Sequence, residues 1–162
     1  MKYSVSSYSY MKMIRAGEIT PFEVIAKTKE LGFDAIEFVD FVDFLPLPEE
    51  ERPAYAEKIR AEADRLGLEI SSLTIGADFI NGCDGDFEKE VERVKKFVDI
   101  GRILGVKRMR HDATVGYPVD SDTYRAFDTL IPRLAEGCRR VTEYAEQFGI
   151  RTMIENHGFY AQ

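Results

Sequence analysis

A short junction motif occurs four times in the sequence and limits the folds that the chain can adopt. In each copy an apolar residue, a glycine and a second apolar residue join the end of a helical pattern to the start of an extended one. The glycines are 35, 38 and 44 residues apart. This spacing is typical of βα units, in which crossover helices link parallel strands. The four copies are Leu31-Gly32-Phe33, Leu66-Gly67-Leu68, Leu104-Gly105-Val106 and Phe148-Gly149-Ile150.

The segments between the junctions predict five strands that alternate with helical regions. Strands are expected over residues 3–8, 33–38, 68–75, 106–111 and 150–154. The first helix carries three agreeing start signals: Thr20 as the N-cap, Pro21 at the first helical position and Glu23 to complete a capping box. It is expected to end at Gly32, where a left-handed cap suits glycine.

Three further helical regions follow from apolar residues at intervals of three and four. Two helices are expected over about 55–66 and 87–105. In the fourth region, Pro132 is expected to separate a short helix that begins near Asp122 from a main helix that begins near Ile131. The longer loops, 39–53 and 76–85, follow strands rather than helices, and loops in that position usually carry the function of a βα protein.

Two architectures fit five alternating βα units, and the pattern alone leaves both open. The units could form a complete, open, doubly wound sheet of five strands, or the first part of an eight-stranded barrel that lacks three strands. A doubly wound sheet usually carries a phosphate-binding loop after its first strand. The segment Ser6-Ser7-Tyr8-Ser9-Tyr10 has neither a glycine-rich turn nor a P-loop lysine.

Composition excludes several classes of protein. The 162 residues have the length of one domain, and their net charge of −7 argues against a general nucleic-acid surface. Nowhere do about 20 apolar residues follow one another, as a membrane-spanning helix requires. Met1-Lys2-Tyr3 leads into an alternating strand rather than the apolar run of a signal peptide. Cys83 and Cys138 are too few for a disulfide framework. A cytoplasmic protein is therefore expected.

The candidate functional residues stand where the predicted strands end. Glu155 and His157 follow the fifth strand and are two residues apart, so an extended chain would direct both the same way. His111 ends the fourth strand and Glu37 ends the second. The carboxyl ends of parallel strands share one edge, so all four residues could lie at one rim. Alternation does not decide which way His111 points, because neither face of its strand is apolar.

Aromatic residues near the ends of the first two strands could form one wall of a site at this rim, although such residues more often pack in the core. They are Tyr8, Tyr10, Phe38 and Phe41.

The order of these segments and their amino-acid sequences resemble those of the xylose isomerase-like TIM-barrel superfamily, which includes sugar phosphate isomerases and epimerases. The resemblance covers the whole chain, 1–162, as a single domain that corresponds to the first five of eight βα units. Its strongest part is the helix end Tyr144-Ala-Glu-Gln-Phe-Gly-Ile150 followed by Ile154-Glu-Asn-His157. The other matching segments are Leu31-Gly-Phe-Asp-Ala-Ile-Glu37, Ala63-Asp-Arg-Leu-Gly-Leu68 and Leu104-Gly-Val106.

The resemblance implies a divalent metal ion (Mn²⁺, Mg²⁺, Co²⁺ or Zn²⁺) at the carboxyl-end mouth of the barrel. In the family its ligands are a glutamate, an aspartate, a histidine and a second glutamate from strands five to eight. Glu155 matches the first ligand, and the other three have no counterpart in the sequence. Glu155 would also serve as the catalytic acid or base, while His157, His111 and Glu37 would contact the substrate.

The function that the resemblance implies is isomerisation or epimerisation of a sugar or sugar phosphate, by proton transfer next to a carbonyl. The 162-residue chain alone would be inactive, because it is an incomplete portion of such an enzyme. A dehydratase and an endonuclease IV-like hydrolase are alternatives on the same fold. An alternative from another class is a non-catalytic α/β module that binds a small molecule or a partner chain. The expected partner is a small sugar, with neither nucleic acid nor membrane.

A barrel that ends after its fifth strand would expose two open sheet edges and part of its apolar interior. Such surfaces favour association with other chains. The chain is therefore expected to self-associate through its open edges into a dimer or a larger assembly.

Overall fold

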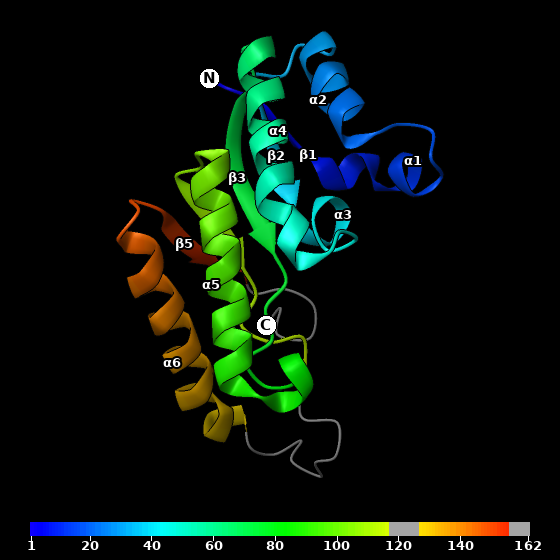
Figure 1. Ribbon diagram of the computed structural model, residues 1–162. Coiled ribbons are helices and arrows are strands. Elements are labelled where there is room, and N and C mark those ends of the chain that lie inside the picture. Colours follow the sequence, from blue (N-terminus) through cyan, green and yellow to red (C-terminus); the bar gives the residue numbers. More distant parts are fainter. Residues whose placement is uncertain (117–126, 156–162) are drawn as a thin grey trace.

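Five parallel strands form one open sheet in the computed structural model, which describes residues 1–116 and 127–155 (Figure 1). The strands are β1 (Ser4–Ser6), β2 (Ala35–Val39), β3 (Glu69–Ile75), β4 (Arg108–His111) and β5 (Arg151–Ile154). Their order in the sheet is β1-β2-β3-β4-β5, and every neighbouring pair is parallel. A doubly wound sheet reverses its strand order at a switch point, whereas a barrel adds each strand next to the last. The consecutive strand order therefore shows that the sheet is part of a barrel and not a doubly wound sheet.

Four long helices connect the strands: α2 (Pro21–Glu30), α4 (Arg52–Leu66), α5 (Phe87–Leu104) and α6 (Phe127–Glu146). Helices α4, α5 and α6 pack against one another in chain order, and Figure 1 shows them side by side along the sheet. Short helices lie in the loops that follow β1, β2 and β3. They are η1 (Ser7–Tyr10), α1 (Met11–Arg15), α3 (Asp40–Asp43), η2 (Glu49–Glu51) and η3 (Gly82–Gly85).

The glycine junctions adopt the conformation that the sequence predicts. Gly67 has φ of +62° and Gly105 has φ of +74°, both in the left-handed region that ends a helix. The next residue then begins the approach to the following strand. The remaining junction glycines, Gly32 and Gly149, also have positive φ.

The predicted capping box is present at the start of α2. Thr20 Oγ1 accepts a hydrogen bond from the Glu23 backbone N–H at 3.2 Å, and Glu23 Oε2 accepts one from the Thr20 N–H at 2.8 Å. These contacts satisfy two of the backbone donors that every helix leaves unpaired at its start.

The core lies between the sheet and the helices and is built from alternate strand residues. Ile36 and Phe38 on β2, Leu73 and Ile75 on β3 and Met109 on β4 are all fully buried there. The residues between them face the other side of the sheet, because successive strand side chains point to opposite faces. That second face is where the candidate site lies.

Three expectations about local structure were wrong or incomplete. The main fourth helix does not begin near Ile131, because α6 runs unbroken from Phe127 with Pro132 inside it. A proline removes one backbone hydrogen bond, and the packing of α6 on α5 compensates for that loss. The expected loop 39–53 contains α3 and η2, and α1 was not predicted at all. The expected short helix near Asp122 lies outside the described residues.

Within residues 1–116 and 127–155, none of the helices combines the length and the apolar character that crossing a membrane requires.

Candidate functional site

A cavity of about 530 Å³ opens at the carboxyl ends of the strands, on the face of the sheet away from the core. Its lining comes from all five strands or from the residues that directly follow them. Polar and apolar side chains share it, as is typical of a small-molecule site. The lining residues are Ser6, Tyr8, Glu37, Val39, Phe41, Thr74, Arg110, Met153 and Glu155.

Glu37, which the sequence predicted as a substrate-binding residue, projects into this cavity from the middle of β2. Its Oε1 accepts a hydrogen bond from Thr74 Oγ1 at 2.5 Å and a longer one from Ser72 Oγ at 3.4 Å. Both donors come from the neighbouring strand β3. They orient the carboxylate within the cavity.

Glu155, the predicted catalytic residue, follows β5 and lies against an arginine on β4. Arg110 Nε is 2.8 Å from Glu155 Oε2, and Arg110 Nη2 is 2.9 Å from Asp112 Oδ1. The Nε–H does not point along the line to the carboxylate, so the first contact is an ion pair rather than a directed hydrogen bond. The Glu155 side chain is 56% exposed, whereas that of Arg110 is only 17% exposed.

His111 is not brought to the cavity, although it was predicted as a substrate-binding residue. It follows Arg110 on β4, so its side chain points to the opposite, helix-covered face and is fully buried. Its Nδ1 is 2.7 Å from the Asp112 carbonyl oxygen, and its ring lies edge-on to Phe79. Burial lowers the pKa of His111 below its ordinary value, which favours the neutral ring.

His157, the other histidine in the prediction, lies outside the described residues.

The four aromatic residues divide between the cavity and the core. Tyr8 and Phe41 line the cavity with their ring centroids 5.8 Å apart in an edge-to-face contact, and both are partly exposed. Tyr10 and Phe38 are buried in the core instead. The aromatic wall is therefore half of the set that the sequence predicted.

Arg110 and Thr74 are cavity residues that reasoning from the sequence did not select. Alternation along β3 could have placed Thr74, because the apolar Leu73 and Ile75 flank it and mark the core face. No such signal exists for Arg110, since the arginines of β4 alternate with a methionine and a histidine, so neither face is clearly apolar.

Two buried aspartates join the ends of the strands that surround the cavity. Asp40 Oδ2 accepts a hydrogen bond from the Gly76 N–H at 3.1 Å, which ties the end of β2 to the end of β3. Asp43 Oδ2 accepts hydrogen bonds from Ser7 Oγ at 2.6 Å and from the Val39 N–H at 3.1 Å, which ties β2 to the end of β1. Burial raises the pKa of each aspartate to about 6, although these hydrogen bonds act in the opposite direction.

The raised pKa of Asp43 predicts that its contribution to stability decreases as the pH rises. The folded-state pKa is about 6, against an ordinary value of 3.8, so the folded protein holds this proton more tightly than the unfolded chain. The stabilisation is complete below pH 3.8 and is lost as the pH rises through 6. The change is on the order of 3 kcal/mol.

Urea unfolding of the wild type and of Asp43→Asn at pH 4 and pH 7 measures this effect. The wild type is expected to lose stability relative to the variant by this amount between the two pH values. Only the difference between the proteins is informative, because surface carboxylates beside cations, such as Glu136 beside Arg139, have lowered pKa values and the opposite pH dependence. A difference that does not change with pH would contradict the prediction.

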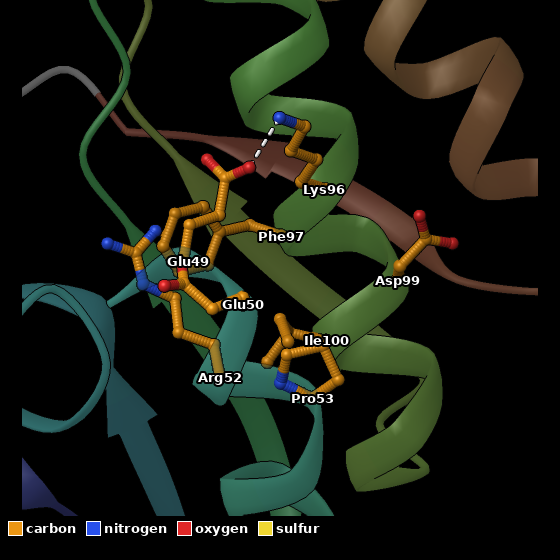
Figure 2. Close-up of a pocket in the computed structure, with 8 residues that line it drawn as sticks. All are labelled: Glu49, Glu50, Arg52, Pro53, Lys96, Phe97, Asp99 and Ile100. Atoms are coloured by element: carbon orange, nitrogen blue, oxygen red, sulfur yellow. Dashed lines mark hydrogen bonds and ion pairs between the residues drawn. The ribbon is translucent and has the colours of Figure 1, made fainter. Parts of the chain in front are cut away.

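A second cavity, of about 330 Å³, lies on the outer side of the molecule between the start of α4 and helix α5. Figure 2 shows Phe97, Ile100 and Pro53 on its apolar side, and the Lys96–Glu49 ion pair across it. This cavity is lined by residues of η2, α4 and α5. It also lacks the set of side chains from neighbouring strands that the first cavity has, so the first cavity is the candidate site.

The described residues do not by themselves form a metal site. In residues 1–116 and 127–155, no three His, Cys, Asp or Glu side chains lie close enough together to hold a metal ion. Glu155, the ligand implied by the resemblance, is instead paired with the Arg110 guanidinium.

The fold and the cavity define a class of protein: consecutive βα units of a parallel barrel, with polar side chains gathered at the carboxyl ends of the strands. The protein family described as "Xylose isomerase-like TIM barrel" matches residues 25–162 of the chain. The chain belongs to this family, which confirms the resemblance seen in the sequence. No curated protein sequence is significantly similar to the chain.

Solved structures with the same fold include two sugar enzymes and a dehydratase. A D-psicose 3-epimerase, solved in the presence of D-fructose, is 21% identical with a TM-score of 0.71, over 98% of this chain and 55% of its own. A putative xylose isomerase from Rhodospirillum rubrum is 16% identical with a TM-score of 0.75, over 95% of this chain and 53% of its own. The probable 3-DHS dehydratase AsbF from Bacillus anthracis is 17% identical with a TM-score of 0.67. The match covers 98% of this chain and 53% of the AsbF chain.

At these identities the similarity shows the fold alone. The chain spans about half the length of the structures that it matches.

Proposed function

We propose that the chain forms one part of a sugar isomerase or epimerase that moves a proton next to a carbonyl group. The observation that carries the proposal is the cavity at the carboxyl ends of β1 to β5, where Glu37, Arg110 and Glu155 lie together. In βα barrels this end carries the catalytic residues. The family membership and the epimerases of the same fold support the same reaction class.

Five of the cavity residues have a role in this reaction. Glu155 takes the proton from the carbon next to the carbonyl, and the bonding electrons move toward the carbonyl oxygen to form an enediolate. Return of a proton to the opposite face of the same carbon completes an epimerisation, and return of a proton to the neighbouring carbon completes an isomerisation. Glu37, oriented by Thr74, accepts hydrogen bonds from sugar hydroxyls. Tyr8 and Phe41 cover the apolar C–H face of the sugar.

His157 remains a proposed contact for substrate oxygens, and His111 has no part in the proposal because it is buried on the other face of the sheet.

A divalent metal ion is part of the proposal through the family resemblance. When bound, such an ion would stabilise the negative charge that develops on the substrate oxygens. Because the described residues do not fit a metal ion by themselves, the steps above are assigned only to the side chains of this chain.

Dehydration is the alternative that one observation favours, because the structure of AsbF, a probable 3-DHS dehydratase, has the same fold over 98% of this chain. Both reactions begin with loss of a proton next to a carbonyl. They differ in the product, because a dehydratase releases water and forms a double bond, whereas an epimerase returns the proton.

The test is an assay in D₂O with Mn²⁺ and a set of ketohexoses, followed by NMR. The protein is assayed as the 162-residue chain and in a form as long as its relatives. The longer form is expected to yield an epimer with deuterium at the carbon next to the carbonyl, whereas the 162-residue chain alone is expected to be inactive. An unsaturated product would favour the dehydratase. If a well-folded longer form exchanges no hydrogen with any ketose, the proposal fails.

Self-association through the open sheet is a further part of the proposal. In the described sheet β1 and β5 each pair with one strand only, and at β5 Ile154 is 56% exposed and Met153 is 37% exposed. Unpaired edges with apolar side chains favour association. Sedimentation of the 162-residue chain at micromolar concentration is expected to give a dimer or a larger species.

The variant Ile154→Lys is expected to shift that distribution toward the monomer. Ile131→Lys is the control, because Ile131 is similarly exposed, at 44%, but belongs to helix α6 rather than to the edge strand. A wild-type chain that sediments only as a monomer would contradict the prediction.

A further inference from the structure

Among the residues that the structure describes, Arg110 is the cation that pairs with the candidate catalytic carboxylate. It reaches Glu155 with Nε at 2.8 Å and Asp112 with Nη2 at 2.9 Å, so one guanidinium joins the carboxylates that follow β5 and β4. The side chains of Arg110 and Asp112 are 17% and 14% exposed. Solvent therefore screens the Arg110–Asp112 pair less than it screens a surface ion pair, whereas the Glu155 side chain is 56% exposed.

The register of the sheet explains why the arginine reaches this carboxylate. Arg110 is paired with Met153, and both side chains line the cavity. Glu155 is two residues beyond Met153, so it lies on the same face, one step closer to the mouth. An unpaired glutamate at the end of a strand would sample several rotamers in solvent. In the structure the Arg110 guanidinium lies beside the Glu155 carboxylate at the cavity.

We propose that Arg110 is the positioning residue of Glu155, and that its positive charge weakens the binding of a divalent cation at this carboxylate in the 162-residue chain. The inference rests on the proposed function only in taking Glu155 as the carboxylate of the site. A divalent cation that binds Glu155 must approach the positive charge of the half-buried Arg110 and weaken the ion pair. The wild-type chain therefore binds such a cation weakly at this position.

The experiment is a titration of the 162-residue chain with Mn²⁺ alone, followed by the electron paramagnetic resonance signal of free Mn²⁺. Arg110→Met removes the charge and keeps much of the apolar stem, so it is expected to bind Mn²⁺ about tenfold more tightly than the wild type. Arg110→Gln serves as a second neutral variant in case the first does not fold, as judged by circular dichroism. Arg110→Lys keeps the charge and is expected to restore the weak binding of the wild type.

Two further variants separate positioning from a general effect of charge. Arg108→Met is the matched control, because Arg108 is on the same strand and the same face, two residues toward the opposite end, and outside the cavity. Its Mn²⁺ affinity is expected to equal that of the wild type. In the double variant Arg110→Met with Glu155→Gln, the tenfold gain is expected to disappear.

The proposal is overturned if the neutral Arg110 variants bind Mn²⁺ no more tightly than the wild type. It is also overturned if the wild type binds Mn²⁺ as tightly as they do and loses that binding in Glu155→Gln. Neither result tests the proposed sugar reaction, which is measured separately as hydrogen exchange next to the carbonyl of a ketose. Absence of that exchange would leave the Mn²⁺ result unchanged, so the two failures can be told apart.

Discussion

Replacing Glu155 by glutamine is expected to lower the rate of the sugar reaction by about a thousandfold, because a positioned acid or base typically contributes 10²–10⁴. Glutamine has nearly the same shape and can still lie over the cavity, but it cannot accept a proton. The measurement is the rate of deuterium incorporation next to the carbonyl of the best ketose, in the form of the protein that spans the length of its relatives.

The matched control for this variant is Glu57→Gln on α4. Glu57 is an exposed glutamate on the helix layer, so its replacement is expected to leave the rate within about twofold of the wild type. Unfolding temperatures of both variants should stay close to that of the wild type, since each change removes only one exposed charge. If Glu155→Gln keeps more than about a tenth of the wild-type rate, Glu155 is not the group that moves the proton.

Replacing Phe38 by alanine is expected to reduce the free energy of unfolding by about 3–5 kcal/mol, the usual cost of removing a buried phenylalanine ring. Phe38 lies on β2, between β1 and β3, and is 0% exposed. Its backbone neighbours Glu37 and Val39 line the cavity, so loss of the ring also loosens the strand that carries a site residue. Urea unfolding followed by circular dichroism measures the change.

Phe41→Ala is the control for Phe38→Ala, because the same side chain is removed three residues further along the chain. Phe41 is 39% exposed at the cavity mouth, so its loss is expected to reduce the free energy of unfolding by less than about 1.5 kcal/mol. It is also expected to weaken sugar binding, because Phe41 forms part of the cavity wall. Equal destabilisation by the two variants would mean that the core has been assigned to the wrong face of β2.

Local chemistry allowed much of the fold to be predicted from the sequence. A left-handed cap needs glycine, so Gly67 and Gly105 mark two helix ends without reference to the rest of the molecule. Thr20 and Glu23 mark the start of α2 for a similar reason, because a capping box involves only neighbouring residues. Elements whose signals are weak were missed, such as α1 and α3, and Pro132 was wrongly expected to break a helix that packing keeps intact.

The candidate site was predictable only in part. Position at the end of a parallel strand correctly brought Glu37 and Glu155 to one cavity, because βα topology places all such ends together. It failed for His111, because the end of a strand does not determine which face a side chain occupies. Alternation determines it only when one face is clearly apolar, and β4 carries arginine, methionine, arginine and histidine in turn.

The sequence by itself determined that strands and helices alternate as βα units. It also determined where the helices end and which residues follow each strand, because these features depend on neighbours within a few positions. Tertiary structure alone decided three further features. The strand order is consecutive, His111 is in the core, and Arg110 is paired with Glu155. All three depend on which strand lies beside which and on the register between them. Such contacts join residues tens of positions apart, and no local pattern encodes them.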